Sequence, residues 1–246
     1  MARKATKIPT ATILRLSIYH RYLQSLQKDG IPVISSAQLA DGTNVNPAQL
    51  RKDLSYFGRF GVRGVGYNVP KLLNQIKKIL GLGKAWNMVL IGAGTIGQAL
   101  LQHHYFKHQG YNFVLVFDNN PATVGKKAAN GMIIHSTDEL PQKLAETPVD
   151  LAVLAVPASS AQKIADMAIE AGIKGILNFT PVRFKVPDHV KLQHVDFTNL
   201  LDTLTYALSS KKNEEKQGLL KKEKSWNAHQ PWKNPRLNYS NLLVTK

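Results

Sequence analysis

A glycine motif between an apolar run and a helical stretch restricts the possible folds of this chain more than any other feature. Residues 87–91 are short and apolar enough for a buried parallel strand, and residues 98–108 have a helical pattern. Between these runs lie Gly92, Ala93, Gly94, Thr95, Ile96 and Gly97. In this context G-x-G-x-x-G is typical of a Rossmann dinucleotide site, with Gly92 at the tight turn, Gly94 against a pyrophosphate and Gly97 between helix and strand.

An acidic residue at the end of the next strand indicates which dinucleotide would bind. The apolar run 113–117 ends at Asp118, which follows Gly97 at about the 20-residue spacing typical of such sites. Its carboxylate can accept hydrogen bonds from both ribose hydroxyls and would repel a 2′-phosphate. We therefore expect NADH or NAD as the cofactor. The alternative interpretation of Asp118 is a turn residue at a strand end.

Further apolar runs continue the alternation of strand and helix that builds a parallel sheet. We expect these strands at residues 132–134, 151–156, 175–178 and 195–197. Ligands bind beyond the carboxyl ends of such strands. Pro157, Phe179 and Pro181 follow two of the runs, so they are expected to line the nicotinamide end, unless these loops are only packing turns.

Capping signals in the N-terminal third predict short helices. Ser35 with Gln38 and Asn46 with Gln49 have the spacing of capping boxes, and they start two helices separated by a tight turn. Two short helices joined in this way form the helix-turn-helix pattern. The second of them is expected over residues 47–57.

One face of that second helix carries polar and basic side chains. At 100° per residue, Arg51, Lys52 and Ser55 lie opposite the apolar positions. These groups suit guanine edges and phosphates in a DNA major groove. The alternative is an ordinary solvated helix face, and the helix alone does not decide between the two.

A glycine-rich segment after this helix favours the DNA interpretation. Residues 57–67 alternate glycine with basic and apolar residues, a pattern suited to a tight hairpin carrying Arg59 and Arg63. A hairpin of this kind beside a recognition helix is typical of a winged helix, and an arginine flanked by glycine can enter a minor groove. A phosphate-binding loop is the weaker alternative, because no Lys-Ser/Thr pair closes it.

The charge is distributed unevenly along the chain. The formal net charge is +16, and residues 1–80 contribute 13 Lys/Arg against 3 Asp/Glu. Residues 81–210 contribute 10 of each kind, and residues 211–246 contribute 9 against 3. A near-neutral middle between two basic ends favours a polyanionic partner.

Composition excludes several other classes of protein. The chain has no cysteine, so it has no disulfide, no thiolate metal site and no cysteine nucleophile, and no metal is expected. No apolar run approaches the ~20 residues of a membrane span, and no secretory signal is expected, so we expect a cytoplasmic protein without a membrane partner. The main alternative function is an NAD-dependent oxidoreductase with a basic N-terminal appendage. We expect no enzyme, since no Tyr-x-x-x-Lys pair or His/Asp dyad supports one.

The motifs together resemble the Rex family of redox-sensing repressors. The resemblance covers about residues 7–210 and is strongest over 49–58, 63–67, 92–97 and 172–179. It implies a transcriptional repressor that binds a palindromic operator as a homodimer and is released by NADH. It also implies that Arg51, Lys52 and Ser55 contact the major groove, and that Arg63 and Gly64 enter the minor groove.

The resemblance also implies a switch between subunits. Asp196 matches a family aspartate at the dimer hub, and Arg21 matches its basic partner from the other subunit. Some family members place a tyrosine at this hub, where His103 is nearest in register here and Tyr105 is a second candidate. Because a histidine stands where those members have the tyrosine, the sequence leaves open whether the switch is built identically.

The expected fold is therefore α/β, with an N-terminal winged helix-turn-helix and a Rossmann-type parallel sheet. We expect a DNA-binding domain over 1–80, an NAD(H)-binding domain over 84–197, and an apolar helix over 198–210. By the resemblance this helix is swapped onto the partner, and the alternative is packing on its own domain. The tail 211–246 is expected to be basic and disordered, as either an arm for non-specific DNA contact or an inert extension.

Overall fold

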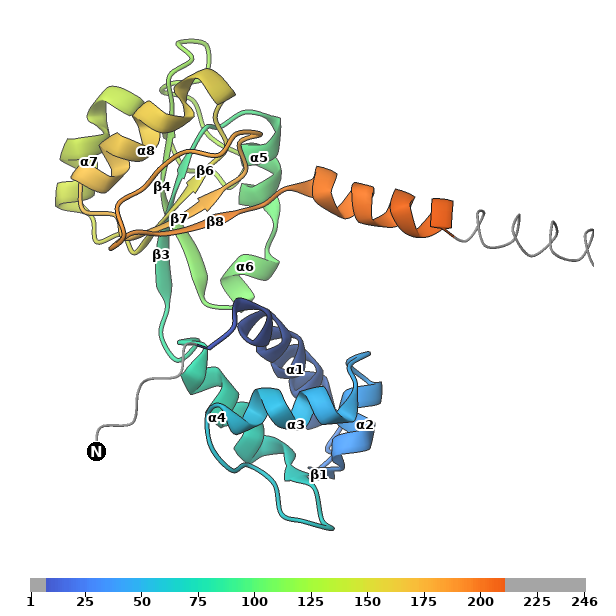
Figure 1. Cartoon of the computed structure of the whole chain (residues 1–246). Coiled ribbons are helices and arrows are strands. Elements are labelled where there is room, and N and C mark those ends of the chain that lie inside the picture. Colours follow the sequence, from blue (N-terminus) through green and yellow to red (C-terminus); the bar gives the residue numbers. More distant parts are fainter. Residues whose placement is uncertain (1–7, 211–246) are drawn as a thin grey trace, which may run out of the picture.

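The computed structural model describes residues 8–210, so the predictions for the tail 211–246 lie outside the described residues. Its elements form an N-terminal group of helices with a two-stranded sheet, followed by a six-stranded sheet flanked by helices (Figure 1). The expected combination of a helical DNA-binding fold and a Rossmann-type parallel sheet is confirmed.

Four helices and one short sheet make up the N-terminal group. They are α1 (Thr10–Lys28), α2 (Ser36–Asp41), α3 (Pro47–Ser55) and α4 (Val69–Ile79), with β1 (Val33–Ile34) antiparallel to β2 (Tyr67–Asn68). Their apolar faces share one core, whose fully buried members include Leu16, Tyr19, Leu23, Leu39, Leu50, Leu72 and Ile76.

The predicted caps are correct at one helix and half correct at the next. Ser35 and Gln38 form the complete capping box of α2. Asn46 caps α3 by accepting from the Ala48 N–H, but Gln49 does not complete a box, because its amide donates to Asp53 instead. The helix also ends at Ser55 rather than at residue 57.

The glycine-rich segment between α3 and β2 is a hairpin, as predicted. Val62 and Gly66 exchange backbone hydrogen bonds of 2.9 and 3.0 Å, which leaves residues 63–65 at the tip. Gly64 has φ +80°, and Gly66 has φ +104° in a place where a Cβ atom would lie 2.4 Å from the Ile34 carbonyl oxygen. In Figure 1 this hairpin projects at the end of the helical group, beyond α3.

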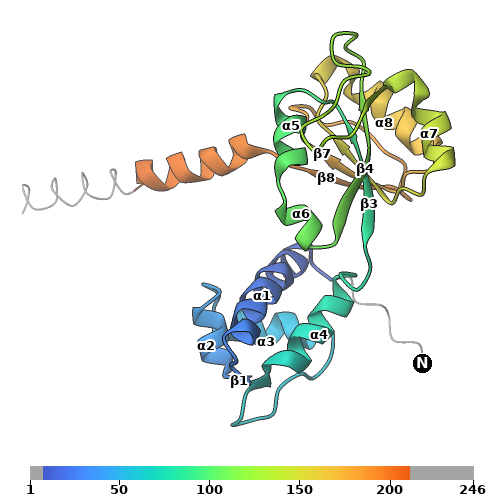
Figure 2. The ribbon, with the colours of Figure 1, turned by 180° about the vertical axis from the view of Figure 1, so that it is seen from behind.

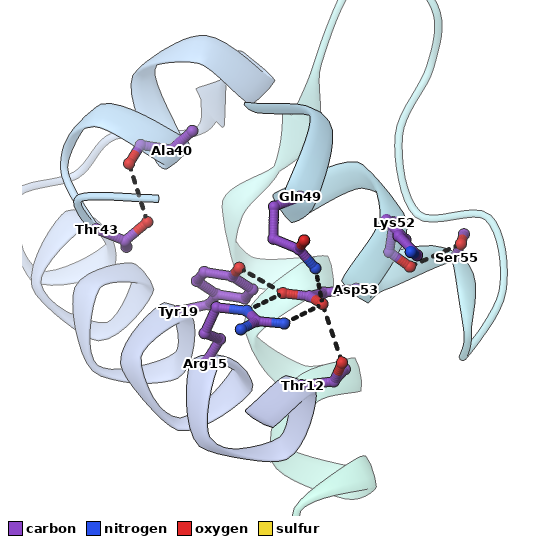
Figure 3. Close-up of polar contacts among 9 residues, drawn as sticks. All are labelled: Thr12, Arg15, Tyr19, Ala40, Thr43, Gln49, Lys52, Asp53 and Ser55. Atoms are coloured by element: carbon purple, nitrogen blue, oxygen red, sulfur yellow. Dashed lines mark hydrogen bonds and ion pairs between the residues drawn. The ribbon is translucent and has the colours of Figure 1, made fainter. Parts of the chain in front are cut away.

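A buried carboxylate joins α1 to α3 (Figure 3). The Asp53 side chain is fully buried and accepts hydrogen bonds from four side chains. These are Thr12, Arg15, Tyr19 and Gln49, of which Arg15 donates through both Nε and Nη2. Burial alone would raise the pKa of Asp53, but these donors outweigh it and lower the pKa to about 2.

The C-terminal group is built on one parallel sheet in the order β5-β4-β3-β6-β7-β8. The strands are β3 (Trp86–Ile91), β4 (Tyr111–Asp118), β5 (Ile134–Ser136), β6 (Leu151–Leu154), β7 (Gly175–Asn178) and β8 (Lys191–His194). The order reverses at β3, where the chain leaves the sheet centre first toward β4 and then toward β6. That reversal is the topological switch point at which dinucleotides bind in such folds.

Helices cover the two faces of this sheet unequally (Figures 1 and 2). One face packs against α7 (Leu140–Glu146) and α8 (Ala161–Glu170) through Val89 and Ile91. The opposite face packs Met88 and Leu90 against α5 (Thr95–Gln102) and α6 (Tyr105–His108). Beyond α6 that second face stays open as an apolar depression of about 400 Å³ lined by residues of β6, β7 and β8.

Several elements differ from the sequence prediction, among them the strand expected at 151–156, which ends at Leu154. The helix expected over 98–108 breaks at His103, whose ψ of 91° is extended, and the chain restarts as α6. The strand expected at 132–134 lies at Ile134–Ser136. The last strand is Lys191–His194 instead of 195–197, because the Asp196 carboxylate accepts from the Thr198 N–H at 3.0 Å and starts a helix.

That last helix, over residues 197–210, extends away from the rest of the chain (Figures 1 and 2). Its apolar side chains are exposed along its described length. They are Phe197, Leu200, Leu201, Leu204, Tyr206 and Leu208. The helix therefore does not pack on its own domain, which was the alternative left open by the sequence.

The segment between the two groups is attached to the sheet by Trp86. The indole N–H donates to the Gly81 carbonyl at 2.9 Å, and the Lys84 ammonium lies 3.8 Å above the ring. Lys84 also pairs with Asp150 at 3.0 Å, and Asp150 accepts from the Asn87 backbone N–H. These contacts tie the connection to β3 and to the residue that precedes β6.

The buried carboxylate predicts how stability responds to acid. Because the pKa of Asp53 is lowered in the folded state, its contribution is present above about pH 4 and is lost as the pH falls through about 2. We expect a loss of about 2 kcal/mol in the free energy of unfolding over this window. Urea unfolding at several pH values measures it. Asp53→Asn is the control, and an equal slope in that variant would contradict the assignment.

Candidate dinucleotide site and nucleic-acid interface

A pocket lies at the carboxyl edge of the parallel sheet, at the reversal of strand order. Its volume is about 520 Å³. It is lined by Gly92, Gly94, Thr95, Ile96, Asp118, Asn119, Asn120, Thr137, Ala155, Val156, Pro157, Ser160 and Ile164. The structure thus brings the glycine motif, the predicted acidic residue and Pro157 into one cavity.

The three glycines of the motif differ in the space around them. At Gly92 (φ +103°) a Cβ atom would lie 2.4 Å from the Ala155 carbonyl oxygen, and at Gly97 it would lie 2.0 Å from the Gly92 oxygen. Both positions exclude any side chain, because strand, turn and helix are in direct contact. At Gly94, by contrast, nothing lies within 4 Å, so its backbone faces open space on the pocket side.

The start of α5 gives this pocket its chemistry. The helix begins at Thr95, directly after Gly94, and the N–H groups of a first helical turn have no partner within the helix. They carry a partial positive charge that favours phosphate oxygens. A pyrophosphate is therefore the group that this end of the pocket suits.

Asp118 holds the glycine turn against the end of β4. Its Oδ2 atom accepts from the Ala93 N–H at 2.6 Å, and its Oδ1 atom accepts from the Asn120 N–H at 2.8 Å. The carboxylate keeps further lone pairs for ligand hydroxyls, since each oxygen can accept more than one bond. Ala93 is buried behind the turn, and its N–H is occupied by Asp118.

Several lining residues were not predicted. Asn119, Asn120, Thr137 and Ser160 each follow a strand end or stand in the short turn before α8. The signal that could have found them was their position just after an apolar run, as for Pro157.

Phe179 and Pro181 also follow a strand, yet neither lines this pocket. Asn178 holds their loop, accepting from the Thr180 N–H at 2.9 Å and donating to the Val182 carbonyl.

A second hollow lies in the N-terminal group, between α3 and the hairpin. Its volume is about 530 Å³. It is lined by Ser35, Ser36, Arg51, Leu54, Ser55, residues 58–66 and Tyr67. Three guanidinium groups, those of Arg51, Arg59 and Arg63, gather here, and the lining residues include no carboxylate. The arrangement suits a phosphate backbone and base edges.

The predicted recognition residues lie as expected relative to this hollow. Arg51, Ser55, Arg59, Arg63 and Gly64 line it, and all are exposed. Lys52 is exposed on the same helix just outside the lining. The Ser55 hydroxyl donates to the Lys52 carbonyl at 2.7 Å, and Arg51 Nη1 donates to the Ser36 hydroxyl at 3.3 Å, a contact that the sequence did not indicate.

The predicted switch residues lie on three different elements. Arg21 is exposed on α1, His103 stands at the break between α5 and α6, and Asp196 caps the helix 197–210. The His103 ring lies 5.5 Å from the Phe106 ring. Within residues 8–210 of a single chain, no hydrogen bond or ion pair joins the three side chains.

Comparisons with known proteins place the chain in a family. Residues 7–55 match the family model described as "Putative DNA-binding protein N-terminus", and residues 83–182 match the one described as "CoA binding domain". The redox-sensing transcriptional repressor Rex of Syntrophobacter fumaroxidans is 52% identical over 206 residues, covering 84% of this chain and 98% of that protein. The chain belongs to the Rex family of redox-sensing transcriptional repressors.

Other Rex relatives and solved structures agree with this assignment. Rex 1 of Thermotoga maritima is 44% identical over 204 residues, covering 83% of this chain and 97% of that protein. The crystal structure of the Rex-family repressor RSP in complex with beta-NAD+ and operator DNA has a TM-score of 0.80 at 39% identity, covering 87% and 98%. RSP in complex with beta-NADH has a TM-score of 0.77 at 38% identity, covering 86% and 99%.

The described residues hold neither a cluster of metal-ligating side chains nor a membrane-spanning helix. Within residues 8–210, no group of three or more His, Cys, Asp or Glu side chains is placed to hold a metal ion. No helix in that part of the chain is long and apolar enough to cross a membrane.

The contrast between two glycines of the motif gives a direct test of the pocket wall. Gly97→Ala should lower the melting temperature, because its Cβ atom would lie 2.0 Å from a backbone oxygen that has no room to move. Overpacking of this kind typically costs about 1–3 kcal/mol. Gly94→Ala, where space is open, should melt like the wild type. Equal melting temperatures for both variants would contradict the described contact.

Proposed function

We propose that this protein is a transcriptional repressor that binds palindromic operator DNA and is released from it by NADH. The observation that carries the proposal is the presence in one chain of a guanidinium-lined hollow and a glycine-walled pocket at the sheet switch point. The RSP structures support it, since that relative was crystallised with operator DNA and beta-NAD+, and also with beta-NADH. Residues 1–80 would bind the DNA and residues 84–197 the dinucleotide.

The DNA contacts follow from the placement of the exposed groups. Helix α3 presents Arg51, Lys52 and Ser55 on one face, which suits a major groove. The hairpin tip presents Arg63 beside Gly64, and an arginine without bulky neighbours fits the narrow minor groove. Arg59 lies at the hairpin base, where it would contact a phosphate.

The dinucleotide contacts follow from the pocket. Its pyrophosphate would lie against Gly94 and the start of α5, and a ribose would bond to Asp118. The carboxylate would repel a 2′-phosphate, so NADH and NAD are the proposed ligands. Pro157 faces the cavity and would bound the nicotinamide end, whereas Phe179 and Pro181 lie outside the lining.

A homodimer is the proposed assembly, with each terminal helix packed on the partner. Leu200, Leu204 and Tyr206 are 69%, 56% and 75% exposed, which is costly for a helix in water. The open apolar face of β6–β8 is a surface of matching character. Two copies would then present their recognition helices to successive major grooves, ~34 Å apart.

Release by NADH needs only a difference in affinity between two dimer arrangements. If NADH binds the non-DNA arrangement about 100-fold better, the equilibrium shifts by roughly 2.7 kcal/mol. The proposed hub consists of Asp196 with Arg21 of the other subunit in one arrangement and with His103 in the other.

No catalysis is proposed for this protein, because the relatives are repressors. The proposed location is the cytoplasm, where operator DNA and NADH are both present.

The deciding experiment is fluorescence anisotropy of a labelled duplex selected from a random pool by the full chain. The duplex is titrated with protein at fixed salt, alone, with NAD and with NADH. We expect tight binding that NAD preserves and NADH abolishes. Specific binding that ignores both nucleotides would remove the sensor function, and the absence of selective binding would favour the oxidoreductase alternative.

Two variants should separate the two activities. Arg63→Ala should weaken duplex binding by about tenfold or more. The affinity for NADH should be unchanged, because Arg63 lines the hollow beside the hairpin and not the dinucleotide pocket. Gly94→Val should leave duplex binding intact and remove the response to NADH, because its side chain fills the pyrophosphate space. Lys163→Ala, at an exposed position of α8, is the control for loss of a cation. A wild-type duplex affinity in Arg63→Ala would refute the hairpin assignment.

A further inference from the structure

Helix α3 carries a buried carboxylate directly opposite its exposed cations. At 100° per residue, Asp53 and Gln49 lie on one side of the helix and Arg51 and Ser55 on the other. Figure 3 shows the Asp53 side chain pointing to α1, and Lys52 and Ser55 on the far side of the same helix. An Asp on the outer face would repel phosphates, whereas here its charge is turned inward and neutralised by Arg15.

The carboxylate is saturated with donors from one neighbouring helix. Oδ1 accepts from Thr12 at 3.0 Å and from Arg15 Nη2 at 2.8 Å, and Oδ2 accepts from Arg15 Nε and from Tyr19 at 2.9 Å. All three donors lie on α1. Gln49, on α3 itself, donates to Oδ1 at 2.8 Å. The recognition helix is thus attached to α1 by a bidentate guanidinium and two hydroxyl groups.

Such a contact fixes orientation in a way that apolar packing does not. Leu50 and Leu54 already bury the inner face of α3, and apolar contacts have little directional preference. A buried ion pair adds little stability over well-packed apolar side chains of similar volume. Its bidentate geometry, however, defines the rotation of α3 about its axis and its position along α1.

Helix α1 has a second face whose apolar side chains are exposed within residues 8–210. Leu14 is 60% exposed and Ile18 is 38% exposed, and Arg21 lies one turn further along. These residues lie outside the Asp53 contacts, so α1 has one face bonded to the recognition helix and another available to the partner subunit of the proposed dimer.

We propose that Asp53 is the positioning residue of the recognition helix: it locks α3 to α1 in a single orientation, so that a displacement of α1 in the dimer moves Arg51, Lys52 and Ser55 with it. The inference rests on the proposed function and deepens it. Asp53 and Arg15 touch no base or phosphate, and they act on sequence recognition only through the orientation of α3.

The test replaces the ionic contact with an apolar one of similar volume. The full-length double variant Arg15→Met/Asp53→Leu is compared with the wild type and with Lys28→Met, which removes a different α1 cation. Each is titrated against the duplex selected by the wild type, and against the same duplex with one base pair changed beneath α3. Circular dichroism, NADH affinity and the salt dependence of duplex binding are measured for all three.

The expected result is a folded double variant with wild-type NADH affinity and an unchanged salt slope. Its discrimination between the two duplexes should fall about tenfold, because one well-aligned bidentate side-chain–base pair contributes about that ratio. Lys28→Met should discriminate like the wild type. A folded double variant with wild-type discrimination would overturn the inference. So would a salt slope smaller by about one, which would mean that Arg15 contacts a phosphate.

A milder pair of variants covers the case in which the double variant does not fold. Thr12→Val and Tyr19→Phe each delete one donor and keep the shape of the side chain. A reduced discrimination in either supports the inference, and wild-type discrimination in both overturns it. If the wild type itself selects no duplex, the proposed function falls together with this inference. Selection by the wild type with unaffected variants removes only the role of Asp53.

Discussion

The carbonyl oxygen of Gly92 lies directly against the Cα atom of Gly97, and the dinucleotide half of the molecule depends on that contact. It brings the start of α5 to the end of β3, so that the helix points its free N–H groups into the cavity. Asp118 can then bond to the Ala93 N–H from the neighbouring strand and hold the turn. With any side chain at Gly97 the helix would move outward, and the pocket would lose its anion-binding end.

The two halves of the protein would bind the phosphate groups of their ligands in different ways. In the proposed function, the pocket would bind phosphate through backbone N–H groups at a helix terminus, and the remaining lone pairs of the Asp118 carboxylate would accept from sugar hydroxyls. The hollow beside the hairpin would bind phosphates through the flexible side chains of Arg51, Arg59 and Arg63 on an exposed surface. Behind that surface lies the inward carboxylate of Asp53, which we propose to set its orientation.

The features that could be predicted from the sequence are those set by neighbouring residues. The glycine turn, the Ser35–Gln38 capping box and the hairpin around Gly64 each follow from local backbone requirements, and all three are present. The Asp53 cluster was missed because its donors on α1 lie more than thirty positions away in the chain. The strand expected at 195–197 failed because the capping bond from Asp196 outweighs the β preference of its apolar neighbours.

The exposed helix over residues 197–210 makes the proposed assembly depend on the protein concentration in the cell. Within residues 8–210 its leucines are exposed, and in the proposed dimer a second molecule buries them. By mass action, the fraction of molecules in the proposed dimer then rises with total concentration, and dilution works against it. Expression level would therefore set the threshold of the redox response together with the nucleotide ratio, and a cell with few copies would lift repression at a lower NADH level.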